Sequence, residues 1–305
     1  SLSQDTLDGA VTMLNQIRFI AGVQDNVTLD DTYNQMTQAA SLVNYVNKQL
    51  THTPEKPNGM EDALFDLGEE GAGSSNIAWA SWAGQTFKDS LINGWMADYD
   101  DSNIDRLGHR RWCINPKMGK TGFGAVAGEN GTYSAMYSFD TSNSGAAETG
   151  VAWPAQNMPI EYFDNVYPWS VSMGSEVDKD SVTVTLTKVS DGQTWTFSAA
   201  SADGYFNVDN GRYGQQGCII FRPDGAKYVA GDSYRVTIEG LGTPVSYTVN
   251  FFDESTCGNT PGEGENPGEG ENPGEGENPG EGENPGEGEN PGEGENPGEG
   301  ENPGE

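Results

Sequence analysis

The sequence predicts an α+β protein: helices that fold over a sheet, then an immunoglobulin-like β-sandwich, then a segment that cannot fold. Three observations predict this order. Apolar residues recur with helical spacing before the stretch Gly108–Pro116, with the alternating spacing of strands after it, and not at all in residues 261–305. We therefore expect three parts, at residues 1–148, 149–253 and 254–305.

The chain is strongly acidic, and this excludes some partners. Its 305 residues carry 47 acids and 15 Lys or Arg, a net charge of -32. Residues 261–305 hold 15 Glu and no base, which leaves 32 acids against 15 bases, or -17, in the remainder. Nucleic acids and anionic membranes bind basic patches, so we expect neither as a partner.

Two further features bear on where the protein acts. No apolar run reaches the roughly 18 residues that would span a bilayer, so we expect no membrane-spanning segment. The chain begins at Ser1 and not at Met, which we interpret as a mature chain whose targeting segment has been removed. We therefore expect a mature or trimmed chain without a membrane span.

Three cysteines are too few for a disulfide scaffold. One interpretation pairs Cys218 with Cys257 and leaves Cys113 unpaired. The other is that all three are reduced and mostly buried thiols. The sequence does not separate the two.

Two helices open the chain. The first is expected over residues 5–20, where Leu7, Leu14 and Ile17 share one face. The second follows Thr28, a hydroxyl with an acid three residues later, which is typical of a capping box. Its buried side is predicted to carry Tyr33, Met36, Ala40, Val43, Val46 and Leu50.

The next segments are expected to be helical as well. Residues 59–80 should form short helical pieces broken by glycines, with a turn at 73–77 into a further helix. A longer helix is predicted over 84–98, where Asp98 follows Trp95 by three residues and so lies on the apolar face. Asp98 is then either solvated at the helix end or directed at a buried partner.

From residue 121 the apolar period becomes two, which predicts strands. Residues 141–150 are rich in Ser, Asn, Gly and Ala, so we place the first boundary there. Asp191-Gly192 signals a hairpin. Short strands with turns between them and no helix indicate a small sandwich. The expected strands are 121–126, 132–139, 182–187, 195–197, 218–221, 234–238 and 247–251.

The C-terminal segment consists of seven copies of Pro-Gly-Glu-Gly-Glu-Asn followed by Pro-Gly-Glu. With no apolar residue to bury, and with proline and like charges that keep it extended, it is predicted to be a disordered spacer. As a free coil its ends would lie roughly 35–40 Å apart. It is either a stalk that holds the folded part away from a surface or a solubilising tail.

Both histidines of the chain are candidates for function. His52 follows the second helix, where Pro54 stops helical backbone, and its side chain can turn back over the core. His109 begins a run of basic and aromatic residues that ends at Trp112; Trp112 itself is expected in the core. If the helices fold over the sheet, both imidazoles and the Asp98 carboxylate converge.

Two histidines with one or two acids can bind a divalent metal or transfer protons. We therefore predict His52 and His109 as candidate ligands of Zn, Mg or Ca. The two are 57 positions apart, which is no local metal motif, so two structural histidines remain the competing interpretation.

A combination of segments resembles a known family. They are Leu14–Arg18, His52, Ser75–Ile77, Trp95–Tyr99, Gly108–Trp112 and Gly122–Gly124. Together, residues 8–140 resemble a CAP domain, the superfamily of cysteine-rich secretory proteins, antigen 5 and plant pathogenesis-related proteins, in its bacterial, disulfide-free branch. The resemblance implies an α-β-α sandwich with a cleft lined by two histidines and two acids.

Matched by position, the family's histidines are His52 and His109, and one of its acids is Asp98, where the family has Glu. The other acid belongs to a Gly-Glu-Asn segment, and here Ser75 precedes Asn76. Because Ser75 is not ionisable, the site should hold a cation less well.

If another acid takes the place of the missing carboxylate in space, Glu69 and Glu70 are the candidates, because both lie close to Ser75 in the sequence.

Three functions follow from these features. The first is a secreted or cell-surface, non-enzymatic protein, attached to a cell wall, whose cleft binds a divalent cation or small ligand; its partner is a protein, a lipid or a cell-wall component. The second is a metal-assisted hydrolase or peptidase that uses His52, Asp98 and His109 with Ser75 as nucleophile. The third is a display protein whose sandwich binds a partner.

Overall fold

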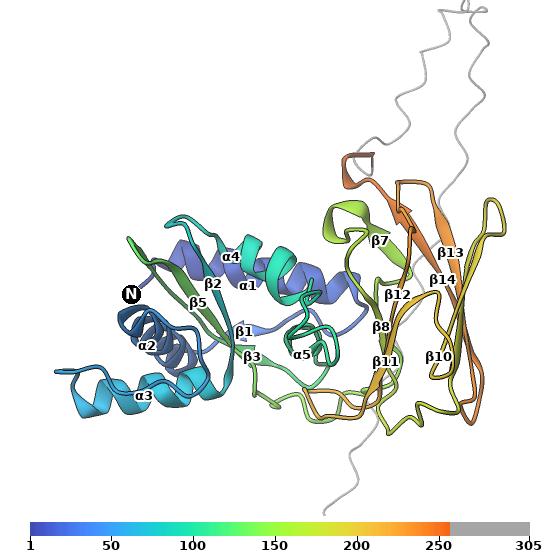
Figure 1. Ribbon diagram of the computed structural model, residues 1–305. Coiled ribbons are helices and arrows are strands. Elements are labelled where there is room, and N and C mark those ends of the chain that lie inside the picture. The colour runs from blue at the N-terminus through green and yellow to red at the C-terminus, as the bar shows by residue number, and fades with distance from the viewer. Residues whose placement is uncertain (257–305) are drawn as a thin grey trace, which may run out of the picture. The chain divides into compact units, whose positions relative to one another are not determined.

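The computed structural model describes residues 1–256, and these lie within one compact unit that spans Ser1–Thr260. A helical part with a small sheet and a purely β part lie side by side in it (Figure 1). The α+β class predicted from the sequence is confirmed. Buried residues of both parts belong to one continuous apolar core, which contains Leu14, Trp95, Trp153 and Trp169.

The N-terminal part is built in three layers (Figure 1). The middle layer is a sheet in the order β2-β5-β4, and β1 pairs with β3 beside it. Alternate residues of β5 face opposite layers: Met136 joins the core under α1, while Ala135 packs against α2 and α3. The elements are α1 (Gln4–Ile20), β1 (Thr28–Leu29), α2 (Asp31–Asn47), α3 (Asp62–Gly73), β2 (Ser75–Ala80), α4 (Phe87–Asp89), η1 (Ser90–Trp95), α5 (Gly108–Cys113), β3 (Lys120–Thr121), β4 (Phe123–Gly128) and β5 (Gly131–Tyr137).

The second predicted helix is present as α2, with differences at both ends. Its N-cap is Asp30, whose carboxylate accepts from the N–H groups of Thr32 and Tyr33, while the predicted cap Thr28 lies in β1. At the other end Val46 and Leu50, predicted on the buried side, are exposed. The prediction was wrong for Val46 and Leu50 because the helical spacing of apolar residues continues in the sequence past the part of α2 that packs on the sheet.

The glycines of residues 59–80 do not break the helix. α3 is continuous, and a Cβ on Gly71 would lie 2.2 Å from the Met36 carbonyl oxygen of α2. Gly68 lies similarly close to Val43. These glycines therefore allow two helices to touch, and the prediction of broken pieces was wrong because it considered only local helix propensity.

The prediction of a further helix after Gly73 was also wrong. Ser75–Ala80 form strand β2, which pairs antiparallel with β5 in the register Ile77 to Ala135. The segment is short and alternates between the two faces of the sheet, so it satisfies its backbone groups on β5.

The C-terminal part consists of two sheets that face each other across an aromatic core. One has the order β10-β9-β13-β14-β7, with β7 parallel to β14, and the other has the order β11-β12-β8-β6. The predicted hairpin joins β9 to β10, with Gly192 at φ +75°. The elements are β6 (Val151–Trp153), β7 (Asn157–Pro159), η2 (Ile160–Tyr162), β8 (Trp169–Ser172), β9 (Thr183–Lys188), β10 (Thr194–Ser198), β11 (Gly204–Asp209), β12 (Cys218–Pro223), β13 (Ser233–Glu239), β14 (Val245–Phe252) and η3 (Glu254–Thr256).

The described residues include two of the three cysteines and none of the repeat segment. Cys113 and Cys218 are buried free thiols, and burial raises the pKa of each. Cys257 and the repeat segment lie outside the described residues. Across residues 1–256, the structure has no helix with the length and apolar character needed to cross a membrane.

The closest contact between α2 and the sheet yields a stability prediction. A Cβ on Gly124 of β4 would lie 2.2 Å from the backbone nitrogen of Gln38. Gly124→Ala should therefore lower the free energy of unfolding by roughly 1–3 kcal/mol or more, because α2 must move off the sheet. Chemical denaturation measures this change.

Gly9→Ala is the matched control. Gly9 lies within α1, and a Cβ added there would have no atom within 4 Å, so alanine should raise stability by roughly 0.5–1 kcal/mol. Equal stability of Gly124→Ala and wild type would contradict direct contact between α2 and β4.

Candidate functional site

His52 and His109, which the sequence proposed as a pair, line the same cavity of about 300 Å³. Ser75, the first residue of β2, lines it as well. The fourth predicted residue, Asp98, does not reach the cavity. The structure thus brings three of the four candidates to one hollow and places the fourth behind His109.

His109 is held by Asp98. Its Nδ1 lies 2.7 Å from Asp98 Oδ1, and the other carboxylate oxygen accepts from the backbone N–H of Arg110 at 3.1 Å. Burial disfavours the imidazolium, but the charge and the hydrogen bond of Asp98 outweigh it, so the pKa of His109 is raised. With Nδ1 engaged, Nε2 is the atom free to meet a ligand.

The backbone conformation that places Asp98 beside His109 differs from the predicted helix. The expected helix over 84–98 is instead the short α4 followed by the π-helical turn η1, which closes with Met96 N–H donating to Leu91 O at 2.8 Å. Asp98 comes after it in left-handed backbone, at φ +46°, and is 2 % exposed. Its burial follows from this turn and from His109, not from a helical stripe.

His52 is held in a similar way from the opposite wall. Its Nδ1 lies 2.7 Å from the carbonyl oxygen of Ala72 in α3, so that carbonyl accepts the Nδ1 proton. The remaining nitrogen, Nε2, is then an acceptor. Both imidazoles of the cavity therefore have Nδ1 fixed by a neighbour, which sets their tautomer and orientation.

Ser75 is the polar group of the cavity that lacks a partner. It is 5 % exposed, and its hydroxyl has no hydrogen-bond partner among the described residues. Asn76 beside it is fully engaged, because its amide donates to His109 O at 2.9 Å and so ties β2 to α5. A buried hydroxyl without a partner costs about 1–3 kcal/mol. Because Ser75 Oγ is almost wholly inaccessible, a ligand recovers this cost only if the side chain turns toward the cavity.

Helix α5, which carries His109, is fixed by the arginine that follows. Arg110 is buried, and its guanidinium donates to the carbonyls of Met96 and Ala97 at 2.7 and 2.9 Å. It also donates to Pro168 O at 2.6 Å, just before β8 of the sandwich. Arg110 therefore joins η1, α5 and the β part at one point.

Arg111 joins α5 to the loop that follows β11. Its guanidinium pairs with Asp209 and donates to the carbonyls of Gly211 and Gln215. In return the Gln215 amide donates to Arg111 O at 2.8 Å. This exchange holds residues 210–217 against α5, and two of them, Arg212 and Tyr213, line the cavity.

Several lining residues were not predicted, among them Arg106, Arg212 and Trp112. Arg106 and Arg212 gave no signal, because neither lies in a motif and Arg212 comes from the loop after β11. Trp112, expected in the core, is half-buried, lines the cavity and contacts the Phe139 ring in a tilted arrangement at a centroid distance of 4.8 Å. Glycines at 108, 211 and 214 were the available clue, since each lies against Tyr213 or Trp112.

The residues present do not form a metal site of the usual kind. Within residues 1–256 no group of three or more His, Cys, Asp or Glu side chains comes together to hold an ion. Neither Glu69 nor Glu70 lines the cavity, so neither replaces the missing carboxylate. Two imidazoles alone are fewer than the three or four protein ligands of zinc sites.

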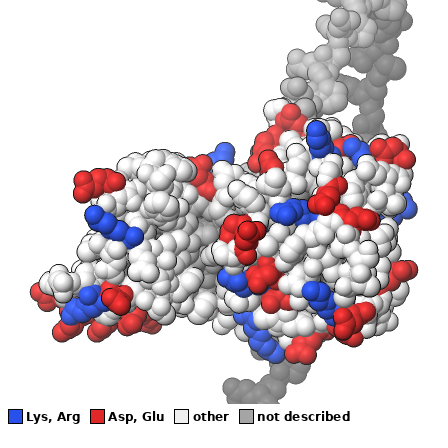
Figure 2. Space-filling model, viewed as in Figure 1, with Lys and Arg blue, Asp and Glu red and all other residues white. Residues whose placement is uncertain are grey.

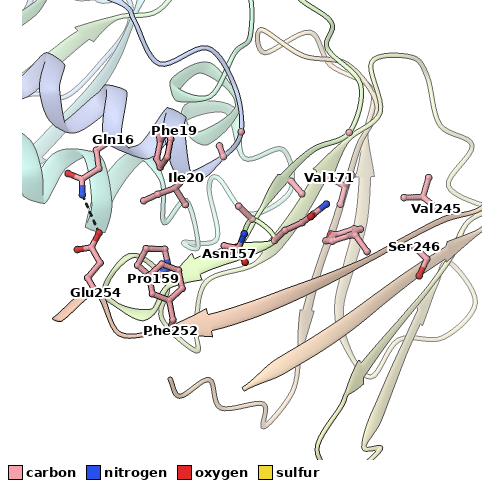
Figure 3. A pocket seen from close by; sticks show the side chains of 17 residues that line it. Gln16, Phe19, Ile20, Asn157, Pro159, Val171, Val245, Ser246, Phe252 and Glu254 are labelled. Carbon is pink, nitrogen blue, oxygen red and sulfur yellow. Dashed lines mark hydrogen bonds between the residues drawn. The ribbon is translucent and has the colours of Figure 1, made fainter. Parts of the chain in front are cut away.

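A larger hollow of about 790 Å³ lies between the end of α1 and strands β7 and β14 (Figure 3). Its lining is mostly apolar or amide, and Glu254 is the one carboxylate among the lining residues, hydrogen-bonded to Gln16 at 3.2 Å. It offers no pair of groups for proton transfer, so the histidine cavity is the better candidate.

Comparison with known families found a match in the N-terminal part of the chain. Residues 11–140, from α1 to just beyond β5, match the model of the cysteine-rich secretory protein family, CAP. The comparison with curated proteins found no match to the chain.

The Asp98–His109 contact predicts a measurable titration. The pKa of His109 should lie above its ordinary value of about 6.5, and Asp98→Asn should lower it, because the charge that favours the imidazolium is removed. NMR titration of the imidazole measures both values. A His109 pKa unchanged by the substitution would contradict the ion pair.

The same contact should make stability depend on pH. Since the folded pKa is raised above the unfolded one, the stabilisation is complete below about pH 6.5 and is lost as the pH rises through the folded pKa. The difference in unfolding free energy between wild type and Asp98→Asn should therefore shrink from about pH 5.5 towards about pH 8. His52→Ala is the control, because it removes a histidine without touching Asp98.

Proposed function

The chain belongs to the CAP superfamily through residues 11–140, and we propose on this basis that it is a binding protein whose histidine cavity holds a small ligand without transforming it. His52, Ser75 and His109 form the contact surface, and Asp98 positions His109. The observation that carries the proposal is the buried, unpartnered Ser75 hydroxyl in a cavity that is also lined by two imidazoles whose orientation is already fixed.

Binding is favoured over hydrolysis by the same hydroxyl. A serine nucleophile needs a base within hydrogen-bond reach, and Ser75 Oγ has no such partner among the described residues. The Asp98–His109 pair resembles the acid and base of a triad, but it is not joined to a nucleophile. A metal-assisted hydrolase with the same residues is the alternative, and within residues 1–256 it also lacks a ligand set.

We extend the proposal to the rest of the chain. Residues 149–253 are an immunoglobulin-like module, which the two facing sheets support, and 254–305 are a spacer, which the repeat composition supports. The protein acts outside the cell, attached to a cell wall by a chain that keeps the folded unit away from the surface. Its partner is a protein, a lipid or a cell-wall component.

Ligand binding should appear as a local change in NMR spectra. A library of small fragments added to the isotope-labelled protein should shift amide signals of β2 and α5, because these elements carry Ser75 and His109. The shifts should be lost in His109→Ala, while His109→Asn should keep part of them. Hydrolysis of a peptide or ester that disappears in His109→Ala would instead support the enzyme.

Metal titration tests the missing carboxylate. Zinc, magnesium and calcium should bind wild type weakly or not at all by calorimetry, since two imidazoles are an incomplete ligand set. Ser75→Glu adds a third ligand, and zinc affinity should rise at least about tenfold. His52→Ala in the Ser75→Glu background should abolish that gain. Tight zinc binding by wild type would overturn the preference for a small ligand.

A further inference from the structure

We propose that the histidine cavity selects an anionic organic molecule, one that joins a carboxylate, sulfate or phosphate to an apolar or aromatic group. This inference rests on the proposed binding function and specifies its ligand. It departs from the cation that a cleft with two acids would take. Three observations support it: the charges of the lining residues, the hydrogen-bond and ion-pair partners of the nearby acids, and the aromatic walls of the cavity.

The lining of the cavity is basic in a protein that is acidic. Arg106, Arg212 and His109 are the basic groups that line it, His52 adds the acceptor Nε2, and no Asp or Glu is among its lining residues. The net charge of residues 1–260 is -17, and acidic side chains are spread over both parts of the visible face (Figure 2). A basic hollow in an acidic surface concentrates anions and repels cations.

The carboxylates near this hollow are already engaged. Asp98 holds His109, Asp105 pairs with Arg106 at 3.0 Å, and Asp209 pairs with Arg111. Asp100 accepts from Ser102 and Asn103. Each of these acids therefore has its own donors, and none is left to neutralise a further cation.

Arg212 is a basic lining residue that has no partner among the described residues. Within the described part of the chain its guanidinium has no hydrogen bond and no ion pair, although it lines the cavity. A guanidinium binds carboxylates, sulfates and phosphates through two parallel donors. Arg212 is thus available to bind the anion, and Ser75 Oγ is a second unpartnered group in the same hollow.

The loop that carries Arg212 is held in position against α5. The ring of Tyr213, the residue after Arg212, packs on Gly108, since a Cβ added to Gly108 would lie 3.1 Å from that ring. Gly214, at φ +72°, lies against Trp112. Arg111 binds the carbonyls of the same loop. The sandwich therefore completes the cavity of the CAP domain, and it supplies the anion-binding group.

Aromatic rings form the remaining walls. Trp112, Phe139 and Tyr213 line the cavity, and the rings of Trp112 and Phe139 contact each other at a tilt of 38°. Apolar walls around a few fixed polar groups are typical of small-molecule sites. The rings should take the apolar end of the ligand while Arg212 and Ser75 take its charged end.

Three probes that share a phenyl ring test the charge preference: benzoate, phenyl phosphate and benzamidine, of which benzoate and benzamidine also share a planar head group. Their binding to the full chain is followed by NMR titration at millimolar concentrations, the affinity range of such fragments. Benzoate or phenyl phosphate should bind, and benzamidine, with the opposite charge on the same ring, should not. Comparing the two anions distinguishes a carboxylate ligand from a phosphate ligand.

Two arginine variants serve as a matched pair. Arg212→Ala should weaken binding of the anionic probes roughly tenfold to hundredfold, because a charge-assisted hydrogen bond is lost. Arg235→Ala removes the same charge from an exposed position on β13 that lines no part of the cavity and should change little. Both variants should melt as wild type does, since neither side chain is buried.

The outcomes separate the two proposals. Equal binding of benzoate and benzamidine, lost in His109→Ala, would keep a ligand-binding cavity and overturn its anionic preference. Unchanged benzoate affinity in Arg212→Ala would overturn the role of Arg212. Failure of all three probes to shift β2 or α5, where other fragments do, would overturn this inference alone, and failure of every fragment would overturn the proposed function too.

Discussion

The structure depends on three buried guanidinium groups, those of Arg18, Arg110 and Arg111. A buried charge is tolerated when its donors are satisfied, and here backbone carbonyls do most of this. Arg18 of α1 donates to the carbonyls of Cys113, Asn115 and Met118 and so caps the end of α5. Burial lowers the pKa of Arg18 and Arg110 to about 10, and both remain charged at neutral pH.

This network explains why the site belongs to both parts of the protein. Arg18 fixes the end of α5, Arg110 fixes it to η1 and β8, and Arg111 fixes it to the loop after β11. His109 lies between these anchors, so its orientation follows from groups on α1, on η1 and on the sandwich. A change in the packing of the β part against α5 would therefore alter the cavity directly.

Much of the fold could be predicted from the sequence, because apolar spacing reports which face of an element is buried. It placed α1, α2, strands β4 and β5 of the N-terminal sheet and most strands of the sheet β10-β9-β13-β14-β7, but only β12 of the sheet β11-β12-β8-β6. It failed where long-range contacts override local preference: Gly68 and Gly71 allow helix contact, and Ser75–Ala80 pairs with β5. In the site, His52 and His109 were predicted as the two histidines of the chain and Ser75 through the family resemblance. Arg212 was not predicted, because nothing local marks a residue that a distant loop contributes.

By the family resemblance, Ser75 lies where a second acid is expected, and this bears on the role of Asp98. In a cleft with two carboxylates, one can face a ligand while the other holds a histidine. Here the single carboxylate is buried behind His109, where both of its oxygens accept hydrogen bonds, so its charge is neutralised inside the wall. The surface facing the cavity then presents imidazoles, a hydroxyl and arginines. The proposed preference for an anionic ligand therefore rests on an Asp98 carboxylate that is already engaged and on Arg212, which the loop after β11 supplies.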